Sequence, residues 1–363
     1  MEYALRTSLL LLPHSRILRH NASSDDNHKP EMAIALSPFR GFCGFRPLND
    51  IARYVQDVPE LRTLVGPPDD LQDRVSAAAD DAEKTKTVLR EVFASLMKAD
   101  KDDVDLQAES IVARYGAALE NNNAEALEVS ADLAKLVVTL NEQFPSDVGI
   151  FCTFILNVVQ LQTGQAMFLQ ANEPHAYLSG EIIECMAASD NVVRAGLTPK
   201  ARDVNVLIDM LTYRAAKSED QLMSPTPFAP LPTSSTYSLY QVQDPKERAD
   251  AALPPSAGLP ASQRSGRSPP TLLYDPPIDE FAVLLTRLAD QQREEQRPLR
   301  GPSILLHAEG QGRLTVSHPH LASADLELDQ PGKVFFIAAD SQVTLASTAP
   351  AAELLIVRAF VEV

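Results

Sequence analysis

The sequence predicts a mainly β protein that carries an α-helical insert. Residues 47–145 are rich in Ala, Leu, Glu, Asp and Lys, and their apolar side chains recur at helical spacing. Short apolar runs with many β-branched and aromatic residues, and with Gly near the breaks, follow residue 145 and return after residue 271. A Pro- and Ser-rich stretch at 216–270 separates these two β regions and offers few large apolar side chains to bury.

Local patterns support each region in turn. In the helical region, Ile51, Val55 and Val58 are spaced by four and three residues, and Gly66 ends the segment before a Pro-Pro pair. Two further segments, TKTVLREVFASLMKAD and LEVSADLAKLVVTLNEQF, show helical periodicity with almost no turn residue inside. The run IFCTFILNVVQL that follows Pro145 stays open, because its composition fits a helix or a strand.

Composition and charge narrow the class of protein. The chain has 363 residues, with 32 Lys and Arg against 49 Asp and Glu, so its formal net charge is −17. This balance argues against binding to nucleic acid or to an anionic membrane, and no apolar run is long enough to span a bilayer. Three cysteines without a Cys-x-x-Cys pair exclude a thiolate zinc site and favour a cytoplasmic protein with reduced thiols.

The first 24 residues have no assignment to a domain. Leu9–Leu12 forms a short apolar core among several Arg residues, which is a weak match to a signal or transit peptide. Glu2 and the interruption by Pro13 fit neither class, so we favour an irregular N-terminal segment.

An internal repeat points to two related β modules. GQAMFLQAN at 164–172 and GKVFFIAAD at 332–340 match in register at Gly, Phe and Ala. This pattern predicts a strand that is entered from a tight bend, and chance similarity between two strands is the alternative. The first copy continues into a segment that contains His175, whereas the second continues without a His. If both copies are jelly rolls, the first alone would carry a ligand.

Two segments concentrate side chains that can support chemistry. NHKPE at 27–31 joins an imidazole, an ammonium and a carboxylate, although a solvated loop would have the same composition. ANEPHAYLSGEIIECMAASDNVVRAGLTPK at 171–200 holds a His, several carboxylates and two cations, and His175 and Tyr177 would share one face of a strand. Elsewhere, HPH at 318–320 is a poor metal motif in polar surroundings. No G-x-S-x-G or P-loop pattern occurs.

These two segments resemble type I mannose-6-phosphate isomerase, the zinc-dependent phosphomannose isomerase. The resemblance runs from Asp25 to Val363 and is loosest in the Pro/Ser-rich stretch. It implies cupin-like jelly-roll modules that flank a helical domain. Combined with the composition, it gives an unassigned segment at 1–24, the remnant of a first cupin-like module at 25–46, a helical domain at 47–145, a cupin-like module with the site motifs at 146–215, a Pro/Ser-rich excursion at 216–270 and a C-terminal cupin-like module at 271–363.

The resemblance also implies roles for individual residues. Glu31 and His175 match zinc ligands, and Arg194 matches the catalytic arginine of the family. Five further residues match positions that line the family's substrate pocket: Lys29, Tyr177, Glu184, Asp190 and Lys200.

The residue types suit an aldose–ketose isomerase, which opens a sugar ring and moves a proton between C1 and C2 through an enediol. A cation held by His and carboxylate can polarise the carbonyl oxygen. Arg194, Lys200 and Lys29 are available for the substrate phosphate. Either Glu184 or Asp190 could carry the proton, and the sequence does not choose between them.

One part of the family pattern is missing. The family takes two further zinc ligands from a Gln-x-His motif on an earlier strand, and this sequence contains no Gln-x-His. We therefore expect a chain that lacks the family's N-terminal part. The resemblance implies a cytoplasmic monomer that interconverts mannose 6-phosphate and fructose 6-phosphate and so supplies GDP-mannose biosynthesis and protein glycosylation. The alternative is a truncated, catalytically impaired cupin-like remnant without a complete zinc site.

Overall fold

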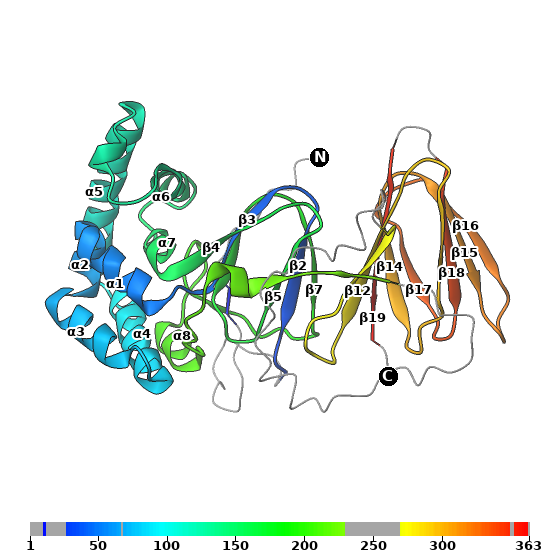
Figure 1. Cartoon of the computed structure of the whole chain (residues 1–363), viewed down its shortest axis with the longest axis horizontal. Coiled ribbons are helices and arrows are strands. Elements are labelled where there is room, and N and C mark those ends of the chain that lie inside the picture. The colour runs from blue at the N-terminus through cyan, green and yellow to red at the C-terminus, as the bar shows by residue number, and fades with distance from the viewer. Residues whose placement is uncertain (1–9, 12–26, 67, 229–268, 349–351, 362–363) are drawn as a thin grey trace. The chain divides into compact units, whose positions relative to one another are not determined.

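The computed structural model describes residues 10–11, 27–66, 68–228, 269–348 and 352–361 (Figure 1). Most of the predicted N-terminal segment at 1–24 and most of the Pro/Ser-rich excursion at 216–270 lie outside the described residues. The chain divides into two compact units. The first comprises Met1–Glu184 and Ala188–Leu222, and the second comprises Cys185–Ala187 and Met223–Val363.

Most helices of the first unit lie between its third and fourth strands, and two short ones follow its eighth strand. Several begin at a side chain that accepts hydrogen bonds from otherwise unpaired backbone N–H groups, namely Asp81, Asp100 and Ser130. The helices are α1 (Leu48–Asp57), α2 (Pro59–Val65), α3 (Pro68–Ala78), α4 (Ala82–Met97), α5 (Lys101–Glu120), η1 (Ala124–Ala126), α6 (Ala131–Gln143), η2 (Val148–Ile150), α7 (Cys152–Ile155), α8 (Val204–Met210) and η3 (Ser218–Gln221).

The strands of the first unit form two sheets. One sheet has the order β4-β3-β6-β1-β8, and the other has the order β7-β2-β5-β9. The open run after Pro145 is helical at first, in η2 and α7, and then becomes strand β4. The strands are β1 (Leu10–Leu11), β2 (Glu31–Ala35), β3 (Phe39–Phe45), β4 (Leu156–Leu161), β5 (Ala166–Leu169), β6 (His175–Ser179), β7 (Ile182–Met186), β8 (Val193–Arg194) and β9 (Leu222–Met223).

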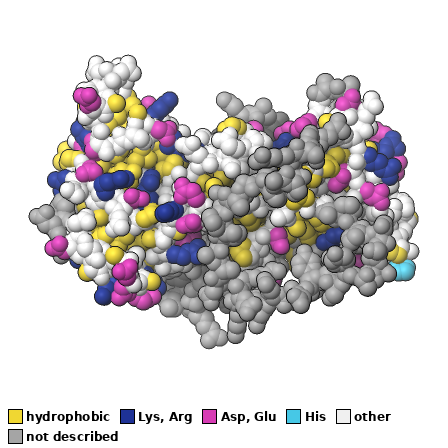
Figure 2. Space-filling model, in the orientation of Figure 1, with side chains coloured by type: hydrophobic (Ala, Val, Ile, Leu, Met, Phe, Trp, Pro, Cys, Tyr) yellow, Lys and Arg dark blue, Asp and Glu magenta, His cyan; other side chains and the backbone are white. Residues whose placement is uncertain are grey.

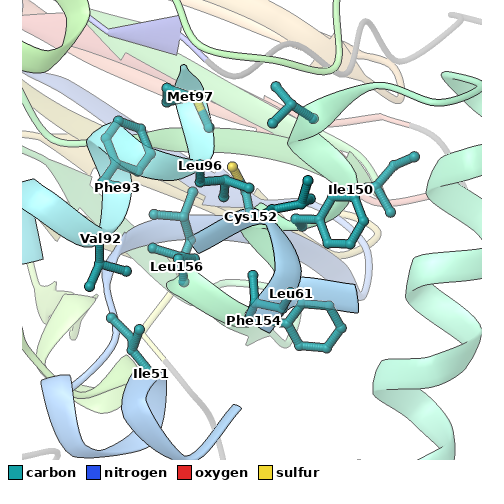
Figure 3. Packing of buried hydrophobic residues seen from close by; sticks show 14 of the residues in the cluster. Ile51, Leu61, Val92, Phe93, Leu96, Met97, Ile150, Cys152, Phe154 and Leu156 are labelled. Atoms are coloured by element: carbon teal, nitrogen blue, oxygen red, sulfur yellow. The ribbon is translucent and has the colours of Figure 1, made fainter. Parts of the chain in front are cut away.

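The β4-β3-β6-β1-β8 sheet is buried on both faces, because successive side chains of a strand point to opposite sides of it. On β6, Ala176 and Leu178 belong to the large core shared with the helices, whereas Tyr177 packs with the cluster between the two sheets. The helical core is well packed, and Phe93 of α4 makes an edge-on contact with Phe45 at 5.3 Å between ring centroids. Figure 3 shows Phe93 among other buried side chains of this core, such as Leu96 and Cys152. The first unit therefore has three layers: helices, the β3–β6 sheet and the β2–β5 sheet.

The second unit is a sandwich of two antiparallel sheets. Their orders are β10-β11-β12-β19-β14-β17 and β13-β18-β15-β16, and both contribute to one apolar cluster that includes Leu305, Leu345 and Ile356. The strands are β10 (Thr226–Pro227), β11 (Thr271–Tyr274), β12 (Ala282–Leu288), β13 (Arg293–Gln296), β14 (Ser303–Glu309), β15 (Gly312–Ser317), β16 (Ala324–Leu328), β17 (Val334–Ile337), β18 (Gln342–Ser347) and β19 (Leu354–Phe360).

The two copies of the sequence repeat are strands that follow a glycine bend. Gly164 and Gly332 both have a positive φ, 84° and 93°, which favours glycine. The copies differ in exposure. Phe168 of β5 is buried because β5 lies between β2 and β9, whereas Phe336 of the edge strand β17 is 74% exposed.

Charged side chains of both signs are intermixed on the face of the molecule seen in Figure 2. This pattern resembles an ordinary solvated surface more than a single field that would attract a polyanion. None of the helices within the described residues is long and apolar enough to cross a membrane.

Candidate functional site

The two predicted metal ligands meet between the sheets of the first unit. Glu31 begins β2, His175 begins β6, and 144 residues separate them in the sequence. His175 Nε2 lies 3.1 Å from Glu31 Oε2, and both side chains are 3% exposed. The structure thus brings together one residue from each motif that the sequence analysis singled out.

Both nitrogens of the His175 ring face an acceptor. Nε2 faces the Glu31 carboxylate, and Nδ1 donates to the backbone oxygen of Glu173 at 3.0 Å. Burial alone would lower the pKa of His175, but the hydrogen bond and charge of Glu31 outweigh it and raise that pKa. Burial likewise would raise the pKa of Glu31, yet its interactions with His175 and with Lys29 lower it. A cationic ring beside an ionised carboxylate is the arrangement that these contacts favour.

A second carboxylate lies next to this pair. Tyr177 OH donates to Glu184 Oε1 at 2.5 Å, and the rings of His175 and Tyr177 are 6.1 Å apart. Burial, together with the charge of Glu31, raises the pKa of Glu184, although the Tyr177 hydrogen bond and His175 oppose this rise. Two neighbouring carboxylates whose pKa values shift in opposite directions can take different roles in proton transfer.

Contacts at Asn27 tie the two motifs to each other. Ser189 Oγ and Asn191 Nδ2 donate to the Asn27 backbone oxygen at 3.1 and 2.9 Å. Lys29 lies two residues further along, with its Nζ 3.8 Å from Glu31 Oε1. The chain from Asn27 to Glu31 is therefore held against the segment that follows β7.

The sheet register places Arg194 near His175. Both residues lie directly opposite Leu10, because β1 pairs with β6 on one side and with β8 on the other. Directly paired residues project to the same face of a sheet, so His175 and Arg194 share a face at two strand spacings, roughly 10 Å between Cα atoms. Strand β1 falls in the segment that the sequence analysis left unassigned.

The remaining predicted residues lie on the segment after β7. Asp190 precedes β8, and Lys200 follows it in an exposed position. Within the described residues, Arg194 and Lys200 make no hydrogen bond or ion pair with the five groups joined at Glu31, namely Lys29, Glu31, His175, Tyr177 and Glu184.

Glu173, a buried carboxyl beside this group, belongs to the same motif but has no role among the sequence-based predictions. Burial raises the pKa of Glu173 to about 7, and its side chain accepts a hydrogen bond from Thr212 Oγ1. Its backbone oxygen fixes the His175 ring, so the turn that holds Glu173 orients a candidate ligand. The position of Glu173 two residues before His175 in the motif was the available signal.

The donors fit a zinc ion only in part. Glu31 and His175 are suitable ligands, but zinc sites ordinarily use at least three protein ligands. The residues that the structure describes contain no group of three or more His, Cys, Asp or Glu side chains arranged to hold a metal. In the HPH motif, the rings of His318 and His320 are 5.9 Å apart, and the His320 backbone N–H donates to His318 Nδ1.

Comparison with known proteins defines the class. Family models of type I phosphomannose isomerase match this chain in three places. The catalytic-domain model matches residues 13–48, the helical-insertion-domain model residues 67–156 and the C-terminal model residues 271–319. The mannose-6-phosphate isomerase of Candida glabrata is 39% identical over 346 residues, which cover 93% of this chain and 70% of that protein. The chain belongs to the type I mannose-6-phosphate isomerase family.

Solved structures agree with this assignment. A variant of phosphomannose isomerase from Salmonella typhimurium has a TM-score of 0.66 and 25% identity, covering 99% of this chain and 77% of that chain. A mannose 6-phosphate isomerase described as holo and zinc bound has a TM-score of 0.65 and 25% identity, covering 99% and 76%. The predicted mainly β, cupin-like fold with a helical insert is confirmed, and zinc occurs in the family.

The chain is shorter than several relatives. It spans 66% of the mannose-6-phosphate isomerase of Emericella nidulans, to which it is 39% identical, and 61% of that of Cryptococcus neoformans, to which it is 41% identical.

Proposed function

We propose that this chain is an aldose–ketose isomerase that interconverts mannose 6-phosphate and fructose 6-phosphate. The observation that supports it most is the group of Glu31, His175, Tyr177 and Glu184 between two sheets, with Arg194 on the same sheet face as His175. Glu31 and His175 are buried, whereas Glu184 is exposed, so a carboxyl that can carry a proton lies beside a buried ion pair where a sugar can reach it. Family membership supplies the substrate class, a sugar phosphate.

Glu184 is the proton carrier in this proposal. Its pKa is raised by burial and by the charge of Glu31, which makes the carboxylate a stronger base toward a carbon-bound proton. The carboxylate takes the proton from C2 of the open-chain aldose while O1 gains the proton of the O2 hydroxyl, and the resulting carboxylic acid then gives its proton to C1 as O2 becomes the ketone oxygen. Tyr177, which donates to Glu184, holds the carboxyl in place for both transfers.

Cations bind the phosphate in this proposal. Arg194 offers a planar fork of N–H donors for phosphate oxygens, and burial lowers its pKa without removing its charge. Lys29 and Lys200 supply further positive charge, Lys29 from within the site and Lys200 from an exposed position. The acidic net charge does not prevent phosphate binding, because these cations lie at the site and distant charges are screened by salt.

Zinc binding by this chain is a separate part of the proposal. Glu31 and His175 would contribute two ligands. A metal ion at His175 Nε2 would displace the proton of that nitrogen into solvent. The described residues provide an incomplete donor set, so the proposed proton transfers depend on the protein's own side chains. Metal analysis after equilibration with zinc tests this part: one ion per chain supports it, and none contradicts it.

Activity measurements decide the function. The purified chain, supplied with zinc, should convert mannose 6-phosphate and should exchange the C2 hydrogen with deuterated solvent by NMR. Glu184→Gln should lower kcat by about 10²- to 10⁴-fold, as expected for loss of a general base. Glu181→Gln is the matched control, because Glu181 is an exposed glutamate directly before β7, the strand that carries Glu184.

The alternative of a catalytically impaired remnant makes the opposite prediction. Such a chain would show neither turnover nor exchange with zinc present, while far-ultraviolet circular dichroism would report a folded protein. A monomeric state and a cytoplasmic location also belong to the proposal, and sedimentation and imaging of the full chain test them.

A further inference from the structure

The second unit buries an arginine between its two sheets. Arg358 of β19 is 0% exposed, and it lies on the inward face of the strand between Ile356 and Phe360, which belong to two apolar clusters. Its sequence context, LLIVRAF, is otherwise apolar, so a charge at this position is unexpected on composition alone.

Two of the three nitrogens of this guanidinium donate to neutral side chains. Arg358 Nε donates to Ser303 Oγ at 2.8 Å, and Nη1 donates to Gln296 Oε1 at 3.0 Å. Gln296 belongs to the opposite sheet and donates in turn to Thr286 Oγ1 at 3.0 Å. Thr286 and Thr271 share a further hydrogen bond of 3.0 Å, so a polar chain runs through the interior of the sandwich.

The nearest linked carboxyl is at the far end of this chain. Burial raises the pKa of Glu294, and a hydrogen bond with Thr271 opposes that rise. Three bridging side chains, Thr271, Thr286 and Gln296, therefore separate Glu294 from Arg358. Within the described residues, no carboxylate forms an ion pair or a hydrogen bond with Arg358 itself.

The third nitrogen of the guanidinium lacks an acceptor. The buried Arg358 Nη2 has no hydrogen-bond partner in the part of the chain that the structure describes. Burial, together with the nearby Arg297, lowers the pKa of Arg358 to about 10, so the group remains charged at neutral pH. A buried cation with an unused donor is costly, and an acceptor of opposite charge would offset that cost.

We propose that the C-terminal β unit binds a small anion, such as chloride or formate, at Arg358 Nη2. The guanidinium of Arg297 adds positive charge near Arg358. The size limit follows from burial: Ser303, Gln296, Thr271 and Thr286 are all at most 3% exposed, so a bulky ligand has no route among them. The site lies in the second unit, whereas the proposed catalytic group lies in the first.

Anion-dependent stability tests the site in the full chain. Thermal unfolding is followed in sodium gluconate, whose anion is bulky, with chloride or formate substituted at constant ionic strength. The small anions should stabilise the wild type along a saturating curve and lower the unfolding equilibrium constant about 100-fold at 100 times the dissociation constant. Arg358→Met should abolish this saturable effect, while Arg313→Met, at an exposed arginine of the same unit, should retain it.

A second measurement does not depend on the variant folding. Crystals of the wild type grown in sodium bromide should show an anomalous peak within hydrogen-bonding distance of Arg358 Nη2. Wild-type stability that is equal in all salts, together with no bromide peak, would overturn the proposal and assign the position to water. Equal saturable stabilisation of wild type and Arg358→Met would overturn it as well, because the anion would then bind elsewhere.

Discussion

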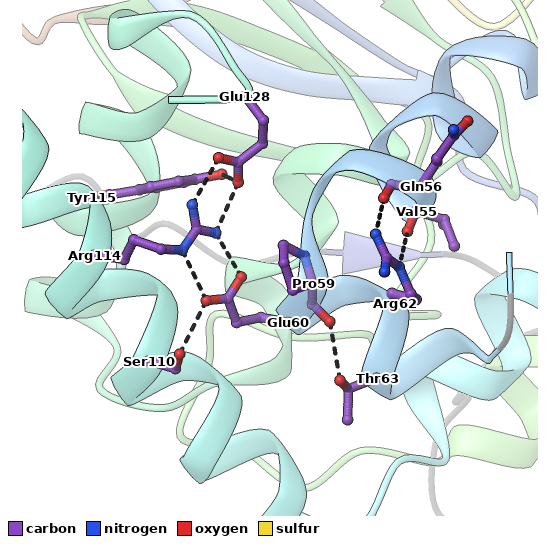
Figure 4. Close-up of polar contacts among 10 residues, drawn as sticks. All are labelled: Val55, Gln56, Pro59, Glu60, Arg62, Thr63, Ser110, Arg114, Tyr115 and Glu128. Carbon is purple, nitrogen blue, oxygen red and sulfur yellow. Dashed lines mark hydrogen bonds and ion pairs between the residues drawn. The ribbon is translucent and has the colours of Figure 1, made fainter. Parts of the chain in front are cut away.

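Arg114 makes the most direct prediction about stability, because it joins three parts of the helical layer. Its Nε and Nη2 donate to Glu60 of α2 at 3.1 and 2.6 Å, and its Nη1 and Nη2 donate to Glu128 at 2.7 and 2.8 Å (Figure 4). Tyr115 OH donates to the same Glu128 carboxylate at 2.8 Å. Replacing Arg114 by Met removes the charge and keeps much of the apolar stem.

The expected loss follows from the exposure of the partners. The Glu60 side chain is 4% exposed, and without Arg114 its remaining side-chain donor is the Ser110 hydroxyl at 3.0 Å. Removing one partner of a fully buried ion pair costs about 3–5 kcal/mol. Since the Arg114 side chain is 32% exposed and water reaches part of it, we expect a smaller loss of about 2–3 kcal/mol in the free energy of unfolding.

Arg313 provides a matched control in the second unit. It also bridges two carboxylates, Asp325 at 2.7 Å and Glu327 at 3.0 Å, but all three side chains are about half exposed or more. Arg313→Met should therefore cost about 0–1 kcal/mol.

Urea unfolding followed by circular dichroism at 222 nm suits Arg114→Met, because the chain has no Trp and the helices dominate that signal, and hydrogen exchange of the strands in the second unit reports Arg313→Met. A loss at Arg114→Met no larger than that at Arg313→Met would refute the argument from burial. Adding Glu60→Gln to Arg114→Met should recover part of the loss, since it removes the stranded charge.

Three further predictions rest on contacts of single residues. The pair of Glu31 and His175 should stabilise the fold most between about pH 4.5 and 6.5, their ordinary pKa values, because the pKa of Glu31 is lowered and that of His175 is raised. The stability lost in Glu31→Gln should accordingly shrink as pH rises through the folded pKa of His175 or falls through that of Glu31. Gly180→Ala should destabilise the chain, because the φ of Gly180 is +97° and a Cβ would lie 2.5 Å from a backbone oxygen. Gly116→Ala in α5 places its Cβ in open space and should stabilise the chain by about 0.5–1 kcal/mol. Thermal melts of the two variants check both expectations. Phe336→Ser should change stability by less than about 0.5 kcal/mol, since the ring is 74% exposed, and a large drop in the melting temperature would contradict this.

Periodicity was informative about the fold because it reports burial directly. Ile51 and Val55 of α1 are fully buried on one helix face, as their spacing of four indicated. The run that begins at Ile150 could not be assigned, because a fully apolar segment has no period to read. It is in fact divided, with Cys152–Ile155 helical and Leu156–Leu161 in a strand.

Pairing between strands that are distant in the sequence was harder to predict. Strand β1 has two residues, and its apolar sequence gave no sign that it would lie opposite both His175 and Arg194. Arg358 was likewise overlooked, although a charge inside LLIVRAF was visible in the sequence. A single sequence shows which faces are apolar, but register and cross-sheet hydrogen bonds depend on three-dimensional pairing.

The placement of the helical insert explains how the two motifs can stay in register although more than a hundred residues intervene. Strand β3 ends at Phe45 and β4 begins at Leu156, and these two residues pair directly. The insert therefore leaves and re-enters one antiparallel pair, so its length does not shift β6, which pairs with the other side of β3. The helical core also packs against Ala176 of β6, the neighbour of His175. The helices thus support from behind the strand that carries the candidate ligand, which links stability of the insert to the geometry of the site.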